Sequence, residues 1–249
     1  MVIFIFVFGL MVGSFLNCVI YRLEQGKSFL RGRSFCPNCK HQLSWQDLIP
    51  IFSFLILGGK CRYCSQKISW QYPLVELFTG IIFLSILLTN SNIYAMAYLL
   101  LVSCFFIIIF VYDLKHYIIP DKVVFPAIGV ALAYDLLRFD LLGRSNLLAS
   151  AFGAAGFFLA IVLISRGKGM GIGDIKLAFL MGLFLGWPNI IVALFLAIFL
   201  GAIMGIGLII SGKKTLKSEV PFGPFLTIGA FSALFWGEKI INFYFNLFL

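Results

Sequence analysis

Residues 177–210 read LAFLMGLFLGWPNIIVALFLAIFLGAIMGIGLII, a stretch of 34 residues without a charged side chain. As one helix it would be about 50 Å long at about 1.5 Å per residue, whereas the hydrocarbon core of a bilayer is about 30 Å thick. Gly186-Trp187-Pro188-Asn189 near its middle is typical of a turn. The stretch therefore predicts two consecutive membrane-crossing helices, 175–187 and 189–211.

The rest of the chain is similarly apolar. Hydrophobic residues make up 61% of the 249 residues, charged residues only 12%, and the mean hydropathy is +1.04. Soluble domains contain about 25% charged residues, so this composition excludes a soluble globular fold. The sequence predicts an all-α polytopic membrane protein with about eight transmembrane helices. The six further predicted spans are 1–21, 73–89, 94–112, 123–137, 147–165 and 223–248.

The positive charges indicate an orientation. The net charge is +9. With the N-terminus outside, 16 of the 19 Lys and Arg residues fall in the four inner loops, which is the bias expected of cytoplasmic loops. Topology and anionic lipid at the inner face thus account for the basic charge. The bilayer is the expected partner, and nucleic acid is not. The inner loops are 22–72, 113–122, 166–176 and 212–219.

The predicted spans divide the chain into three parts. These are a first transmembrane helix over 1–21, a cytoplasmic cysteine-rich insert over 22–72, and a seven-helix membrane domain over 73–249. Within the insert, Leu48–Leu57 reads LIPIFSFLIL. This segment is too short to cross a bilayer and indicates an interfacial or re-entrant piece.

Two carboxylates stand at the ends of predicted spans, Asp113 and Asp174. Each taken alone is equally well explained as a residue at the membrane rim, paired with Lys115 or Lys176. The topology, however, puts both at the cytoplasmic membrane level, so they can meet although 61 positions separate them. Two carboxylates that share a site supply one acid and one base, as peptide hydrolysis by activated water requires. The pair predicts an aspartyl protease site.

The insert contains four cysteines in the pattern C-x2-C-x21-C-x2-C: Cys36, Cys39, Cys61 and Cys64. Each C-x2-C pair can present two thiolates to one tetrahedral Zn²⁺. Disulfides are disfavoured in a reducing compartment. We expect a structural zinc ion here, because four thiolates leave no open position for water.

A third carboxylate, Glu76, stands at the start of the second span. It is a rim residue, a partner in a buried ion pair, or a functional contact. The last of these makes Glu76 a candidate cofactor-binding residue.

Asp113 and the motif Gly171-Ile172-Gly173-Asp174 resemble the two catalytic motifs of GxGD aspartyl proteases. Within that group the chain resembles the bacterial prepilin peptidases, or type IV leader peptidases, over nearly its whole length. The ordered set of motifs is more specific than any one of them. The further matching motifs are Gly13–Asn17 with Arg22, the two C-x2-C pairs, Tyr72-Pro73 with Glu76, Ile119–Asp121 and Pro221–Pro224.

The resemblance implies an enzyme of the bacterial inner membrane that works at the cytoplasmic face. Such enzymes cut the basic leader from type IV pilin-like precursors after a Gly, and many methylate the new N-terminus with S-adenosylmethionine. Asp113 and Asp174 match the catalytic pair, and the cysteine insert is tied to methyl transfer. In this family context, the functional role of Glu76 would be a contact to the substrate amine or to the methyl donor. Methylation is implied by the resemblance alone, because the insert contains no strand followed by GxGxxG.

The alternative is a transporter or channel, in which intramembrane carboxylates form a proton relay. That function predicts carboxylates at mid-span and inverted repeats, and the sequence shows neither. No pattern in the sequence indicates an oligomeric state.

Overall fold

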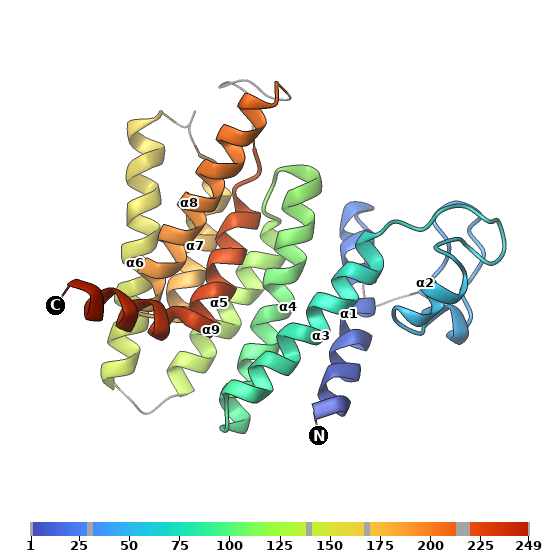
Figure 1. Cartoon of the computed structure of the whole chain (residues 1–249), viewed down its shortest axis with the longest axis horizontal. Coiled ribbons are helices and arrows are strands. Elements are labelled where there is room, and N and C mark those ends of the chain that lie inside the picture. Colours follow the sequence, from blue (N-terminus) through green and yellow to red (C-terminus); the bar gives the residue numbers. More distant parts are fainter. Residues whose placement is uncertain (1, 29–31, 138–140, 167–169, 213–219, 249) are drawn as a thin grey trace. The chain divides into compact units, whose positions relative to one another are not determined.

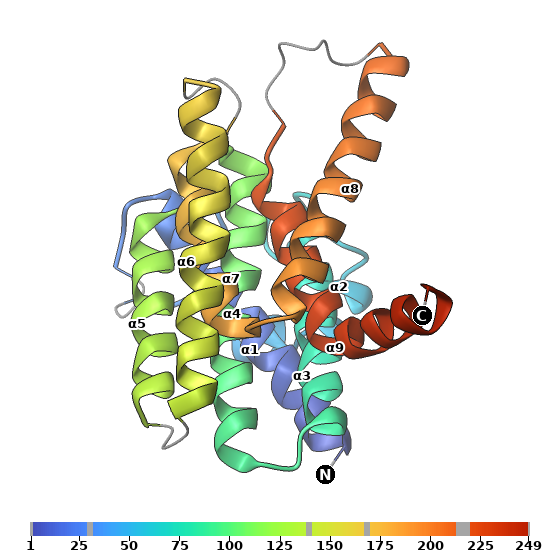
Figure 2. The same cartoon turned by 90° about the vertical axis from the view of Figure 1, so that its left-hand side faces the viewer.

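The computed structural model, shown in Figures 1 and 2, describes residues 2–28, 32–137, 141–166, 170–212 and 220–248. Over these ranges the chain is helical, and its only β pairing is the two isolated bridges Phe35–Gln42 and Lys60–Lys67. The all-α prediction is confirmed. The chain divides into two compact units, Met1–Ile108 and Ile109–Leu249.

Each of the eight predicted spans corresponds to one helix. Two short helices lie in the insert, a 3-10 helix η1 (Trp45–Leu48) and α2 (Phe52–Ile56). The eight long helices are α1 (Val2–Glu24), α3 (Gln71–Thr89), α4 (Ile93–His116), α5 (Asp121–Leu137), α6 (Leu141–Ile164), α7 (Ile172–Leu185), α8 (Asn189–Ile210) and α9 (Gly223–Phe248).

Five of these helices are long and apolar enough to cross a membrane, judged over the described residues. They are α1, α3, α4, α8 and the part of α6 from Gly143 to Ile164. The other three are weaker candidates: α5 has 17 residues and α7 has 14, and α9 contains Glu238 and Lys239. A multi-pass membrane protein is therefore shown, and the count of eight crossings stays a prediction.

The first unit is built on α1 and α3, which pack along each other (Figure 1). Ile20, Phe83 and Ile86 are fully buried in it. The side-chain amide of Asn17 donates to the carbonyl of Tyr72 at 3.1 Å, which joins α1 to the start of α3. A buried amide needs such a partner, because leaving it unpaired costs free energy.

The second unit is organised around α7, which packs against α5, α6 and α9. Leu177, Leu180, Met181 and Leu183 are fully buried in α7, as expected of a helix that is apolar on all sides and surrounded by others. Gly182 faces Ala151 of α6 so closely that a Cβ there would overlap the Ala151 backbone. Figure 2 shows α6 and α7 lying against each other.

The turn between α7 and α8 confirms that the 34-residue apolar stretch forms two helices. Helix α7 ends at Leu185 and α8 begins at Asn189. The side chain of Asn146, near the start of α6, binds the backbone of Trp187 twice. Its Nδ2 donates to the Trp187 carbonyl at 3.1 Å, and its Oδ1 accepts from the Trp187 N–H at 2.6 Å. These bonds pair the N–H and the carbonyl of Trp187 within the turn.

The orientation in the membrane rests on the basic residues and stays a prediction. Several of these residues lie outside the described part of the chain: Arg31, Arg138, Lys168, Lys213, Lys214 and Lys217. The proposed division at residues 21 and 72 likewise stays a prediction.

Candidate active site

Asp113 and Asp174 both belong to the second unit. Asp113 lies in the last turn of α4, and Asp174 lies in the first turn of α7. Their exposed fractions are only 4% and 8%. The two carboxylates are close enough for their charges to interact. Two acidic groups 61 positions apart in sequence are thus both buried and interact electrostatically.

Each carboxylate accepts a hydrogen bond from a backbone N–H at the start of a helix. Gly223, the first residue of α9, donates to Asp113 Oδ2 at 3.0 Å. Gly171, the residue before α7, donates to Asp174 Oδ2 at 3.2 Å. The N–H groups at a helix start have no partner within the helix, and the helix dipole favours negative charge there. These bonds offset part of the cost of burying the carboxylates.

Gly223 is a site residue whose role the sequence left open. A Cβ at this position would lie 2.6 Å from Asp113 Oδ2, so any side chain would push the carboxylate or the helix start away. In the sequence, Pro221–Pro224 is only one of the motifs that match the family, and nothing local indicates that Gly223 faces Asp113, which is 110 positions away.

The start of α7 is also contacted by the segment that leads into α5 and by the first turns of α5. Lys176, a sequence-based candidate partner for Asp174, forms an ion pair with Asp121 of α5, with Nζ and Oδ1 2.6 Å apart. Its ammonium group also lies 5.0 Å from the ring centre of Phe125. A Cβ added at Gly173 would lie 3.1 Å from the Cβ of Ile119. The segment that begins α5 therefore holds the helix start on which Asp174 stands.

The four cysteines of the insert form two knuckles of the same geometry. In each knuckle the first cysteine donates its N–H to the carbonyl five residues on, Cys36 to His41 and Cys61 to Gln66, both at 2.9 Å. In each, the residue after the second cysteine has a positive φ, 60° at Lys40 and 57° at Ser65. These turns direct both thiols of a knuckle to the same side.

The four sulfurs converge on one point. All four Sγ atoms lie within 4.8 Å of one another, and those of Cys36 and Cys64 are 3.9 Å apart. Four thiolates around a tetrahedral Zn²⁺, with bonds of about 2.3 Å, would be about 3.8 Å apart. The cluster therefore fits a zinc ion, and it is the group found among the described residues that could hold a metal ion.

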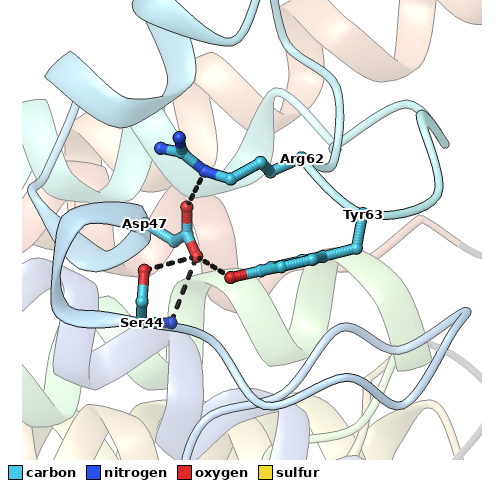
Figure 3. A network of polar contacts seen from close by, with 4 residues as sticks. All are labelled: Ser44, Asp47, Arg62 and Tyr63. Carbon is cyan, nitrogen blue, oxygen red and sulfur yellow. Dashed lines mark hydrogen bonds and ion pairs between the residues drawn. The ribbon is translucent and has the colours of Figure 1, made fainter.

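Asp47 of η1 braces the second knuckle, as Figure 3 shows. Its carboxylate accepts from Arg62 Nε at 2.8 Å, from the Tyr63 hydroxyl at 3.2 Å and from the Ser44 hydroxyl at 2.8 Å. Burial opposes ionisation of Asp47, but the bonds from Arg62 and Ser44 outweigh it and hold the pKa of this carboxyl below its ordinary value. Because Arg62 and Tyr63 stand between Cys61 and Cys64, the network fixes the loop that presents these two thiols.

Glu76 is buried in α3 and faces the insert. Its Oε2 accepts from the backbone N–H of Ile51 at 2.8 Å, and the hydroxyl of Ser14 donates to it as well. Ile51 has φ +63° and ψ −51°, a conformation that costs a non-glycine residue about 1–3 kcal/mol. The contacts thus show Glu76 holding a strained turn, and its predicted role toward a methyl donor stays a proposal.

Comparisons with known proteins cover both halves of the chain. Residues 7–90 match the Bacterial Peptidase A24 N-terminal domain, and residues 99–206 match the Type IV leader peptidase family. A protein of Aeromonas hydrophila named prepilin leader peptidase/N-methyltransferase is 33% identical, over 98% of this chain and 94% of that protein. The protein of the same name from Bacillus subtilis (strain 168) is 32% identical, over 98% and 97%. No solved structure matches the chain.

The matched relatives extend over almost the full length of the chain. The paired aspartates fall one in each of the two motifs that the resemblance singled out, and the cysteine cluster falls within the N-terminal match. The chain belongs to the type IV leader peptidase family.

Proposed function

We propose that this chain is a membrane-bound prepilin leader peptidase and N-methyltransferase in which Asp113 and Asp174 are the catalytic dyad. The observation that supports the dyad is the burial of two electrostatically interacting carboxylates, each bonded to the N–H at the start of a helix. Membership of the family supports the substrate class, type IV pilin-like precursors, because the relatives are named for this activity.

The arrangement suits peptide hydrolysis by activated water. Two neighbouring carboxyl groups that cannot both ionise easily supply one carboxylate and one carboxylic acid. The carboxylate takes a proton from the attacking water, while the acid donates a hydrogen bond to the carbonyl oxygen of the scissile bond. The acid proton then passes to the leaving amine as the C–N bond breaks. The N–H groups of Gly171 and Gly223 orient the two carboxylates through these steps.

Methyl transfer is assigned to the same chain through its relatives, whose names include N-methyltransferase. The reaction moves a methyl group from S-adenosylmethionine to the amine that cleavage exposes. Zinc held by the four cysteines would fold the insert, since a site closed by four thiolates has no open position for catalysis. Glu76 is the proposed contact to the amine or to the donor.

The site is placed at the cytoplasmic face of the bacterial inner membrane. This placement is supported by the excess of Lys and Arg in the loops that lie at the same helix ends as Asp113 and Asp174. A basic leader would be presented on that side while the rest of the precursor stays in the bilayer.

A transporter function is not favoured. Asp113 is three residues from the end of α4, and Asp174 is the third residue of α7. Carboxylates that relay ions across a bilayer are expected near mid-span.

A cleavage assay in detergent tests the proposal. The substrate is a pilin-like precursor with a basic leader, Gly before the cut and Phe after it. Mass spectrometry reads both products, with and without S-adenosylmethionine. We expect cleavage after the Gly, and a product heavier by one CH2 group when the donor is present.

The Asp174→Asn variant serves as the comparison, with the folded state monitored by gel filtration. Undiminished cleavage by this variant would remove Asp174 from the mechanism. A folded wild type that cuts no such precursor would contradict the peptidase function itself.

A further inference from the structure

Helix α2 of the insert has two apolar faces. Phe54 is buried, and its ring centre lies 5.0 Å from that of Trp70. Leu55 and Ile56 lie three and four residues after Phe52, so all three side chains are on one side of the helix. They are 61%, 63% and 80% exposed. The insert thus builds its own core with one face of α2 and leaves the other uncovered.

The position of α2 relative to the membrane follows from its contact with Glu76. The residue before α2, Ile51, donates its N–H to Glu76 at 2.8 Å. Glu76 is the sixth residue of α3, which puts it about 7–8 Å along the helix from its first residue at about 1.5 Å per residue. Helix α3 is one of the five helices that can cross a membrane. The start of α2 therefore lies against the side of α3, a helix that can cross the membrane.

The charge of the insert matches the inner surface of a membrane. Residues 22–72 contain eight Lys and Arg against two acidic residues, Glu24 and Asp47, an excess of six positive charges. Anionic lipids of the inner leaflet attract such segments. Trp45 and Trp70 are exposed in the same insert, and tryptophan is enriched where a bilayer meets water. An exposed apolar helix face within a basic segment is typical of interfacial binding.

We infer that the exposed face of α2, formed by Phe52, Leu55 and Ile56, is a membrane foot. It is seated between the headgroups and the acyl chains of the bilayer that α1 and α3 cross. Glu76, through the N–H of Ile51, is the tether that holds the foot beside α3. The foot positions the cysteine knuckles at the membrane surface, and this holds independently of the reaction that the enzyme performs.

Quenching of tryptophan fluorescence by brominated lipid tests the foot. The full chain, with its four tryptophans replaced by Phe, receives one tryptophan through Ile56→Trp and is placed in nanodiscs of phosphatidylcholine and phosphatidylglycerol. The bromines are on acyl carbons close to the headgroup. Because an interfacial helix face lies about 5–10 Å into this boundary, we expect fluorescence to fall by about half or more.

The matched control is Gln66→Trp in the same background. Gln66 is exposed in the second knuckle, between Ser65 and Lys67, and we expect little quenching there. Zinc content confirms that both variants keep a folded insert. No quenching at position 56, or equal quenching at positions 56 and 66, would overturn the inference. A cross-link from position 56 to residues 109–249 or to a second copy, without quenching, would show that protein covers the face instead.

The tether is tested in the Ile56→Trp background. Glu76→Ala removes the acceptor of the Ile51 N–H, so quenching at position 56 should fall toward that of the control. Glu76→Gln keeps an acceptor oxygen and should retain most of the quenching. Unchanged quenching in the Ala variant would leave the foot in place but overturn the role of Glu76 as its tether.

Discussion

The carboxylate of Asp113 is held by a single backbone N–H, that of Gly223, and Asp174 by that of Gly171. Neither bond involves a side chain of the partner residue. A backbone donor at a helix start cannot rotate away, so the two carboxylates are held in place before any substrate arrives. Pre-set geometry of this kind lowers the cost of reaching the transition state.

Replacing either aspartate with Asn should abolish cleavage, because an amide can neither take a proton from water nor give one to the leaving amine. We expect the rate to fall by about a thousandfold, within the range known for loss of a general acid or base. The measurement is the initial rate on the precursor substrate. Glu238→Gln, which changes an exposed carboxylate of α9, is the control and should cleave at the wild-type rate.

Gly223→Ala should impair cleavage without unfolding the protein. The new Cβ would lie 2.6 Å from Asp113 Oδ2, so the carboxylate must shift. A misplacement of this size can cost about a hundredfold in rate. Gly207→Ala in α8 is the matched control, since a Cβ there meets nothing within 4 Å. If both variants cleave equally well, the contact between Gly223 and Asp113 does not matter to catalysis.

At the scale of elements, the start of α7 is held by α5. The ion pair of Asp121 with Lys176 is partly exposed, and such pairs contribute only about 0.2–1 kcal/mol to stability. Lys176 lies two residues after Asp174, so its ion pair with Asp121 has a different role. The pair fixes the rotation of the first turn of α7.

Removing this pair should therefore change activity more than stability. We expect Lys176→Met to lower the cleavage rate several-fold with a thermal unfolding midpoint close to that of the wild type. The double variant Asp121→Lys with Lys176→Asp restores an ion pair of reversed polarity and should regain part of the rate. A double variant as slow as the single one would argue that Lys176 acts through a contact other than Asp121.

The knuckles of the insert are elements that metal should stabilise. Cys36→Ser with Cys61→Ser removes one thiolate from each knuckle, and four ligands are needed to close a structural site. We expect zinc content to fall from one ion per chain to nearly none by atomic absorption. Methyl transfer should fall more than cleavage, because the dyad lies in the other unit. Equal loss of both activities in a folded variant would contradict a separate role for the insert.

At the scale of the whole molecule, the described residues form eight long helices, of which five are strong candidates to cross a membrane, so the topology has to be measured. Helix α7 is short because neighbouring helices cover it, so it needs little lipid contact of its own. A short helix inside a bundle can still connect the two faces of the membrane when the loops at its ends extend into the bilayer.

Reporter fusions test the eight crossings. Fusions of alkaline phosphatase after Asn90 and after Trp187 should be active, since both positions are predicted outside. Fusions after Gly171 and after Gly212 should be active only with β-galactosidase, which works in the cytoplasm. The pair at Gly171 and Trp187 brackets α7 alone. The same reporter active at both positions would mean that α7 does not cross, and the count of eight would be wrong.

The sequence alone determined the class of the protein and the extent of its helices, because both depend on local composition. In lipid, the backbone N–H and C=O groups of a long charge-free run find their partners within a helix. The turn at Gly186–Asn189 ends one helix before the next begins. The spacing of Cys36, Cys39, Cys61 and Cys64 was equally readable, because metal ligands on a short loop are close neighbours in the chain. Asp113 and Asp174 were found through topology, which requires only the direction of each span.

Only the tertiary structure decided what lies against these residues. The contact of Gly223 with Asp113 joins positions 110 apart, and the bond of Glu76 to Ile51 joins a membrane helix to the insert. Neither leaves a local pattern, because a backbone N–H is present at every residue and only packing selects which one meets a carboxylate. The same reason explains the exposed face of α2: its residues read as one apolar run, and only folding separates the face that is buried from the face that is left for the bilayer.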